Sequence, residues 1–205
     1  MKTIRRAALV AIFVGTLFAA NMALAGEVSG KIVGAGLKSV ENIAIYAVRT
    51  SAVPGKKFDP PAQHVSVDER NLKFVPHTTL ILQGTTVDFL NSDQIAHNVY
   101  WPSISGNRKL RHSLTIVSPG QKKSFQFDIP GTVQLLCNLH PDMLGYVVVV
   151  PTPYFALTSH DGTFTIKNVP PGAYTLQTWS EDGKPTTQTI TVTDAAMTVE
   201  LTVKK

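Results

Sequence analysis

The stretch GTVQLLCNLHPDMLGYVVVV, residues 131–150, decides the fold and the chemistry expected of this chain, and it holds Cys137, the only cysteine. Residues alternate between the two faces of a strand, so Cys137 shares its face with Val133. The cysteine is followed by His140 and Met143 in the pattern C-x-x-H-x-x-M, and a second apolar run comes next. A loop that leaves one strand and folds back into another can aim three side chains so spaced at one point.

Short alternating runs rich in Val, Ile, Thr and Phe recur on both sides of this stretch, between clusters of Gly, Pro, Asn and Asp. Examples are TTVDFLN at 85–91, KSFQFDI at 123–129 and GTFTIKNVPPGAYTLQTW at 162–179. Helical periodicity is absent from this part of the chain. Regularly spaced short strands predict an all-β fold of the sandwich or barrel kind.

Two Pro-rich stretches divide these runs into blocks. SAVPGKKFDPPAQ at 51–63 and VVPTPYF at 149–155 are poor central strands, because proline cannot donate to a strand ladder. We therefore expect a central domain at 61–151 and two flanking pieces, 26–60 and 152–205.

The first 25 residues have the pattern of a secretory signal peptide. They combine a basic start, an apolar run at 7–20 and the small-x-small sequence Ala-Leu-Ala at 23–25. The apolar run is too short to cross a bilayer comfortably, and no longer one follows, so we predict export to the periplasm or beyond with no membrane span.

The charge of the chain gives no sign of a nucleic-acid partner. Three of the 19 basic residues and none of the 14 acidic ones fall in the signal, so the remainder is nearly neutral. A nucleic-acid surface needs clustered positive charge, whereas the short basic runs here are typical of solvated turns.

A further residue that could bind a metal ion lies forty residues before Cys137. The sequence NSDQIAHNVYW at 91–101 places His97 at the edge between a strand and a loop. The four donors would then be His97, Cys137, His140 and Met143. Two imidazoles, a thiolate and a weak axial thioether are the ligands of a blue copper electron-transfer site. Zinc sites seldom use thioether, and calcium and magnesium prefer oxygen.

Other interpretations of the same residues stay open or are weaker. Cys137 could be a small buried thiol, and Met143 could fill the core. A Cys–His nucleophile would need an orienting third group and a substrate cleft, neither of which the sequence indicates, so we do not expect an enzyme. The other histidines show no ligand partner: His64, His77, His112 and His160.

Two segments, NLKFVPHTTLILQGTTVDFLNSDQIAHNV at 71–99 and FDIPGTVQLLCNLHPDMLGYVVV at 127–149, resemble the cupredoxins, the family of plastocyanin and amicyanin. The resemblance implies a Greek-key cupredoxin β-sandwich and one type 1 copper ion. The copper ligands that it implies are His97, Cys137, His140 and Met143. It also implies that Asn98 ties the two ligand loops together, with the backbone N–H of Asn138 pointing toward the Cys137 sulfur.

In functional terms, the resemblance implies an exported carrier of single electrons through Cu(II)/Cu(I), without substrate turnover. A redox partner, such as a c-type cytochrome or an oxidoreductase, would dock on an apolar patch near His140. Trp101 would either extend this patch or cover strand ends. The alternatives are copper binding for storage or delivery, and an adhesion-type β module with a vestigial site.

The outer pieces resemble a second kind of module. GEVSGKIV at 26–33, NIAIYAV at 42–48 and the run at 162–179 are similar to a carboxypeptidase-regulatory or transthyretin-like β-sandwich. The resemblance implies that 26–60 and 152–205 form one smaller sandwich into which the cupredoxin is inserted. The combination resembles exported proteins described as methylamine-utilisation-like.

Overall fold

The computed structural model describes residues 25–51 and 57–205. All but the last residue of the predicted signal peptide lies outside these ranges, as does the middle of the first Pro-rich stretch. The prediction of an all-β fold is confirmed, because the described chain is built of strands with one short 3-10 turn, η1 (Arg108–Leu110). None of its helical segments has the length and apolar character to cross a membrane.

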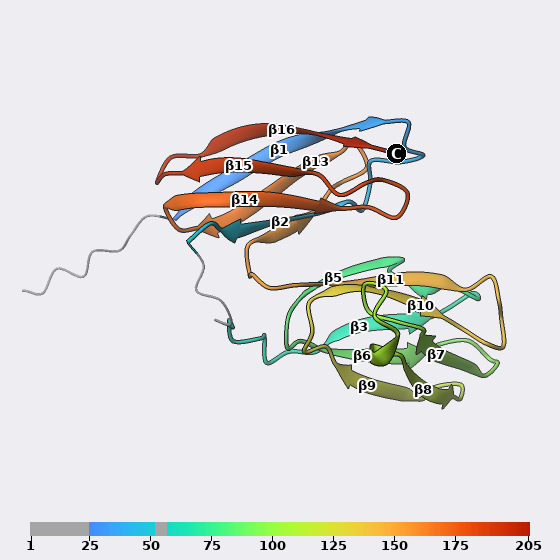
Figure 1. Ribbon diagram of the computed structural model, residues 1–205. Helices are drawn as coiled ribbons and strands as arrows, with labels where there is room; N and C mark the ends of the chain where they lie inside the picture. Colours follow the sequence, from blue (N-terminus) through green and yellow to red (C-terminus); the bar gives the residue numbers. More distant parts are fainter. Residues whose placement is uncertain (1–24, 52–56) are drawn as a thin grey trace, which may run out of the picture.

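The strands fall into two groups, which Figure 1 shows as two stacked β-sandwiches. The central sandwich contains β3 (Val65–Glu69), β4 (Phe74–Val75), β5 (Thr78–Leu82), β6 (Thr86–Asn91), β7 (His97–Trp101), β8 (His112–Val117), β9 (Lys122–Gln126), β10 (Gly131–Leu136) and β11 (Leu144–Val150). The terminal sandwich contains β1 (Gly26–Ala35), β2 (Ala44–Arg49), β12 (Phe155–Leu157), β13 (Thr163–Val169), β14 (Gly172–Trp179), β15 (Thr187–Val192) and β16 (Met197–Lys204).

The central sandwich packs a five-stranded sheet, in the order β5-β11-β10-β7-β8, against a four-stranded sheet, in the order β4-β3-β6-β9. Every second residue of these strands points into the space between the sheets, as the alternating sequence requires. Side chains from both sheets form one apolar core, which includes Phe74, Phe89, Trp101, Phe127 and Leu135.

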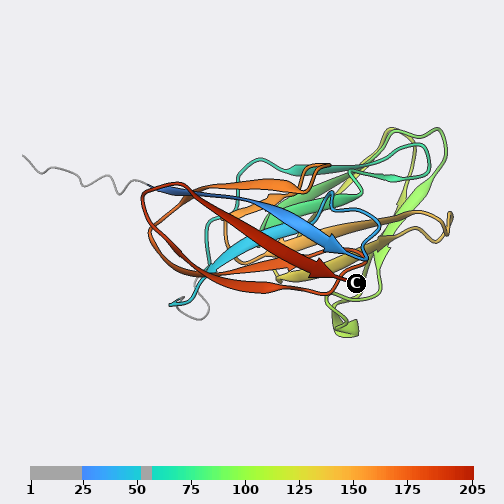
Figure 2. The same ribbon diagram turned by 90° about the horizontal axis from the view of Figure 1, so that it is seen from above.

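The terminal sandwich joins segments from both ends of the chain. Its three-stranded sheet has the order β13-β1-β16, and its four-stranded sheet has the order β12-β2-β14-β15. In the view from above, the blue strand β1 runs beside the dark red strand β16, with which it pairs in parallel (Figure 2). The sandwich has a core of its own, which includes Ile32, Ile45, Tyr174, Leu176 and Leu201.

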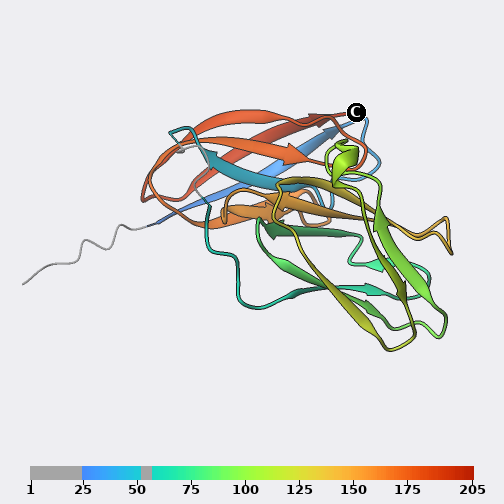
Figure 3. The ribbon, with the colours of Figure 1, turned by 60° about the horizontal axis from the view of Figure 1, so that its bottom comes forward.

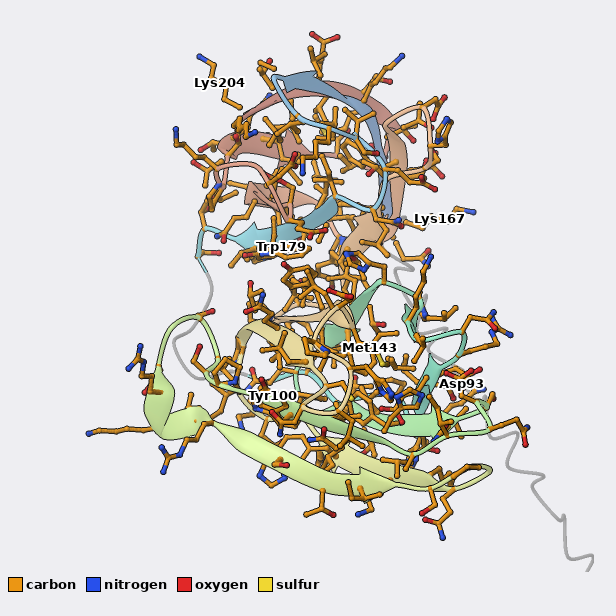
Figure 4. All side chains as sticks on the ribbon, turned by 90° about the vertical axis from the view of Figure 1, so that its right-hand side faces the viewer. Asp93, Tyr100, Met143, Lys167, Trp179 and Lys204 are labelled. Carbon is orange, nitrogen blue, oxygen red and sulfur yellow. The ribbon has the colours of Figure 1, made fainter. Side chains whose placement is uncertain are left out.

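The two sandwiches meet through their larger sheets, as Figure 3 shows from a third direction. Val148 and Val150 of β11 pack with Ala44 of β2 in a third apolar cluster, against which Trp179 of β14 also packs. Figure 4 shows Trp179 on the side of the terminal sandwich that faces the central one. β11 thus buries both of its faces, which explains its unbroken run of valines.

Candidate metal centre

The candidate ligands come together because two neighbouring strands end at the same edge of the sheet. His97 is the first residue of β7, and Cys137 directly follows the last residue of β10. These strands are antiparallel neighbours, with Leu136 opposite Tyr100. The start of one antiparallel strand lies beside the end of the next, so two residues far apart in sequence share one edge.

A tight turn returns the chain from His140 to the core. The backbone N–H of Met143 donates to the carbonyl oxygen of His140 at 3.0 Å. Pro141 occupies the second position of this four-residue turn, where its fixed φ is favourable. The turn leaves His140 half-buried, whereas Met143 is 1% exposed and belongs to the core of the central sandwich. Figure 4 shows Met143 within the body of that sandwich.

Three of the four predicted ligands have converging donor atoms. Nδ1 of His97 lies 2.9 Å from Nδ1 of His140, and Sγ of Cys137 lies 3.8 Å from the same His140 nitrogen. Within residues 25–51 and 57–205, they form the one group of His, Cys, Asp or Glu side chains close enough to share a metal ion. His97 and Cys137 are almost completely buried, so His140 is the member of the group that reaches the surface.

Asn98 links the two loops that carry these residues. Its side-chain oxygen Oδ1 accepts a hydrogen bond from the backbone N–H of Asn138 at 2.8 Å and lies 3.7 Å from Sγ of Cys137. The link itself is as predicted. The expectation that the Asn138 N–H points toward the cysteine sulfur is wrong, because Oδ1 of Asn98 takes this donor.

The sequence did not point to the role of Asp93. Its Oδ2 atom lies 2.9 Å from Nε2 of His97, on the far side of the imidazole from His140. The backbone N–H groups of Asn71 and Leu72 also donate to the Asp93 carboxylate. These donors, that of Leu72 foremost, hold the pKa of Asp93 below its ordinary value. The one signal in the sequence is the spacing of four residues between Asp93 and His97.

Glu69, at the end of β3, is a buried carboxyl that the sequence prediction did not include. It is 0% exposed, and neither side-chain oxygen has a hydrogen-bond partner among the described residues. Burial, followed by the nearby charges of Asp68 and Asp93, raises the pKa of Glu69 to about 8. Glu69 therefore carries a proton at neutral pH. Glu69 lies two residues after the buried Val67, on the same face of β3, and this alternation is the feature of the sequence that could have indicated its burial.

Trp101 does not extend a surface patch. It is 1% exposed, and its indole Nε1–H donates to the carbonyl oxygen of Leu110 at 3.1 Å. The ring packs edge-on against Phe125 and at a tilt against Phe127, so it covers the strand ends, the second of the two roles predicted for it. Of the other histidines, His64 and His77 contact carboxylates, as expected of hydrogen-bonded surface residues.

The donor set fits copper on chemical grounds. Two imidazole nitrogens and one thiol sulfur face each other in a largely buried place, and no carboxylate belongs to the group. Thiolate suits Cu(I) and imidazole suits both copper oxidation states, whereas the oxygen ligands that calcium and magnesium require are missing from the group.

Comparison with known proteins agrees with this chemistry. Residues 61–150 match the family model of copper binding proteins of the plastocyanin/azurin family. Residues 152–201 match a different model, that of domain II of polysaccharide lyase family 4.

Among curated relatives, amicyanin-alpha of Methylorubrum extorquens is 33% identical over 91 residues, which are 44% of this chain and 76% of amicyanin-alpha. Plastocyanin of Scenedesmus fuscus is 30% identical over 81 residues, which are 37% of this chain and 83% of that protein.

Solved structures show similar matches. A reduced Cu(I) form of an amicyanin variant is 25% identical with a TM-score of 0.40, over 51% of this chain and 99% of that one. The copper-containing nitrite reductase of Thermus scotoductus is 23% identical with a TM-score of 0.41, over 59% of this chain and 28% of that one.

The chain, through its central sandwich, belongs to the plastocyanin/azurin family of copper binding proteins. Its cofactor is copper, and family membership implies copper-dependent electron transfer.

Proposed function

We propose that this protein carries single electrons on one type 1 copper ion held by His97, Cys137, His140 and Met143. The observation that carries the proposal is the convergence of the His97, Cys137 and His140 donor atoms within 4.8 Å of one another. Bound copper would supply a one-electron Cu(II)/Cu(I) couple. Met143 would be the fourth residue to hold the ion, because the turn that follows His140 returns its side chain to the core.

In this function the protein holds the ligand atoms in fixed positions and keeps water away from them. The bond from Asn138 to Asn98 fixes the cysteine loop against the histidine strand, and β10 and β7 provide a rigid base. Ligands that move little between oxidation states reduce the rearrangement that accompanies electron transfer. No substrate or bond-breaking step is needed, so we propose a carrier rather than an enzyme.

Burial of the ligands favours a carrier over a copper storage or delivery protein. His97 is 0% and Cys137 is 3% exposed, so an incoming copper acceptor cannot reach them without opening the loop. The half-buried His140 is the proposed port for electrons.

Three exposed apolar side chains lie on loops that hold the ligand histidines or contact Asp93. Leu139 precedes His140 and is 49% exposed, Ile95 lies two residues before His97 and is 45% exposed, and Leu72 is 48% exposed beside Asp93. We call these three residues the apolar rim. A redox protein, such as a c-type cytochrome or an oxidoreductase, is the proposed partner for this surface, because apolar patches of modest size suit brief docking.

The ligand assignment is tested by one titration. Cu(II) is added to the metal-free protein and to the variants Cys137→Ser and Met143→Leu. We expect an intense charge-transfer band near 600 nm in the wild type, its loss in Cys137→Ser, and a retained band with a shifted potential in Met143→Leu. A band that survives Cys137→Ser would overturn the assignment, and rapid loss of copper to a chelator would favour delivery.

Docking at the apolar rim is tested by electron-exchange kinetics with a mono-haem c-type cytochrome. Leu139→Asp is expected to slow the second-order rate, whereas Val33→Asp, at a position of the terminal sandwich that is 41% exposed, should leave it unchanged. Equal rates for both variants would place the docking surface elsewhere.

We also propose that the chain is exported and that it consists of a cupredoxin domain at 61–151 inserted into a sandwich made of 26–60 and 152–205. Separate apolar cores and the pairing of β1 with β13 and β16 support this division. Mass spectrometry of the exported protein should give a chain that begins at Gly26. The transthyretin-like and methylamine-utilisation-like resemblances stay predictions.

A further inference from the structure

Several hydrogen bonds hold Asp93 in place in addition to its contact with His97. Its Oδ1 accepts from the backbone N–H of Asn71 at 2.6 Å, and its Oδ2 accepts from that of Leu72 at 3.0 Å. Its own N–H donates to Oδ1 of Asn91 at 2.9 Å. The same Oδ2 atom lies 2.9 Å from Nε2 of His97. The side chain therefore has little freedom to turn away from the imidazole.

The turn that provides the two N–H donors has an unusual conformation. Asn71 and Leu72 have φ values of 54° and 58°, and the flanking residues Arg70 and Lys73 bond to each other through both backbone groups. Positive φ at both central residues is typical of a type I′ hairpin turn, in which glycine and asparagine are preferred. Leucine in this region is unfavourable. The bond between the Leu72 N–H and Asp93 helps to stabilise it.

The contact with Asp93 determines which nitrogen of His97 carries the proton. An ionised carboxylate can only accept hydrogen bonds, so Nε2 of His97 must be the donor. In neutral imidazole the other nitrogen, Nδ1, then carries a lone pair and no proton. This is the atom that faces His140 at 2.9 Å within the candidate metal group. His97 is 0% exposed, so water does not compete for its Nε2–H.

We propose that Asp93 is a positioning residue of the copper centre, which fixes the ring and the tautomer of His97 and makes its Nδ1 a stronger donor to Cu(II). The effect on Cu(II) rests on the proposed function, whereas the effect on the ring and the tautomer of His97 does not. A carboxylate behind a ligand histidine raises the basicity of the ligand, and loss of such a partner typically lowers metal affinity by about 10–100-fold. A stronger nitrogen donor favours the oxidised ion, so Asp93 should lower the reduction potential.

The first measurement needs no metal. The metal-free wild type, Asp93→Ala and the control Asp142→Ala are labelled with ¹⁵N-histidine and compared by NMR at the same pH. Asp142 is an exposed acid next to the proposed ligand Met143. Asp142→Ala therefore removes one carboxylate near the centre, as Asp93→Ala does. We expect the Nε2–H tautomer of His97 in the wild type and in Asp142→Ala, and a mixture of tautomers in Asp93→Ala. An unchanged tautomer in Asp93→Ala would overturn the positioning role.

The second measurement uses copper alone. Asp93→Ala should bind Cu(II) about 10–100-fold more weakly. Each tenfold loss confined to Cu(II) raises a one-electron potential by about 59 mV. Asp93→Asn keeps an acceptor oxygen and should fold even if the alanine variant does not, with the tautomer retained and a smaller rise in potential. A shift no larger than that of Asp142→Ala would contradict the proposal. Failure of the wild type to bind Cu(II) would instead contradict the ligand assignment, while the metal-free tautomer would still decide the role of Asp93.

Discussion

The side-chain oxygen of Asn98 accepts the backbone N–H of Asn138 at 2.8 Å, although 40 positions separate the two residues in the chain. Asn98 adjoins His97, and Asn138 adjoins Cys137, so this one bond joins the two halves of the candidate metal centre. The orientation of the cysteine loop therefore depends on a side chain of the histidine strand.

Removal of this bond should loosen the centre. Asn98→Ala leaves the Asn138 N–H without its acceptor, which should lower the free energy of unfolding by about 1–3 kcal/mol. Urea unfolding and the rate of copper loss to a chelator measure the effect. Asn138→Ala is the matched control, because it keeps the backbone N–H. Equal losses in both variants would show that the bond is not the cause.

The buried Glu69 should make the stability of the protein depend on pH. Its pKa in the folded state is about 8, against an ordinary 4.5, so the folded chain holds a proton that the unfolded chain releases between these values. Stability should fall as the pH rises from about 4.5 to about 8. Glu69→Gln cannot titrate and should gain about 1–3 kcal/mol relative to the wild type over that interval, as followed by urea unfolding. Parallel curves for the two proteins would contradict this.

Asp88 should have the opposite effect at acid pH. It accepts hydrogen bonds from Lys122 at 2.8 Å and Ser124 at 2.6 Å, and these, that of Lys122 foremost, hold the pKa of Asp88 well below its usual value. Its contribution is present above the usual pKa of 3.8 and is lost as the pH falls below it. Asp88→Asn should cost about 1–2 kcal/mol at neutral pH and flatten this acid dependence. The exposed Asp128→Asn serves as the control in the same thermal or urea series.

The contact between the sandwiches should contribute to stability through Trp179. Its ring lies 5.1 Å from that of Tyr146, centroid to centroid, and packs on the cluster around Val148. Trp179 is half-buried, so Trp179→Ala should cost about 2 kcal/mol, less than a fully buried tryptophan. We expect one urea transition in the wild type and two in Trp179→Ala, whereas the exposed Val33→Ala should change little. A single unshifted transition would show that the sandwiches are not coupled through this contact.

The sequence was enough to predict the strands and the grouping of three candidate ligands. Both depend on local patterns, since alternation puts Cys137 in phase with Leu135, and the His140–Met143 spacing matches a tight turn. The position of His97 followed from its place at a strand edge.

The contacts behind the ligands could not be predicted in the same way. The Asp93 carboxylate that contacts His97 also accepts from the backbone of a turn at 70–73, and nothing in the local pattern relates those two segments. Trp101 follows a strand that the sequence located, but its burial depends on the sheet opposite. Tertiary packing decided both.

The Val147–Val150 run has a practical consequence for anyone who wishes to attach the copper-binding half alone to an electrode. A fragment cut before residue 61 and after Val150 would expose Val148, Val150 and Leu80 to water, because the side chains that pack on them belong to β2, β12 and β14. The isolated central sandwich would therefore expose an apolar patch on one side and tend to aggregate. Polar replacements at those three positions would be the first change to make in an engineered sensor.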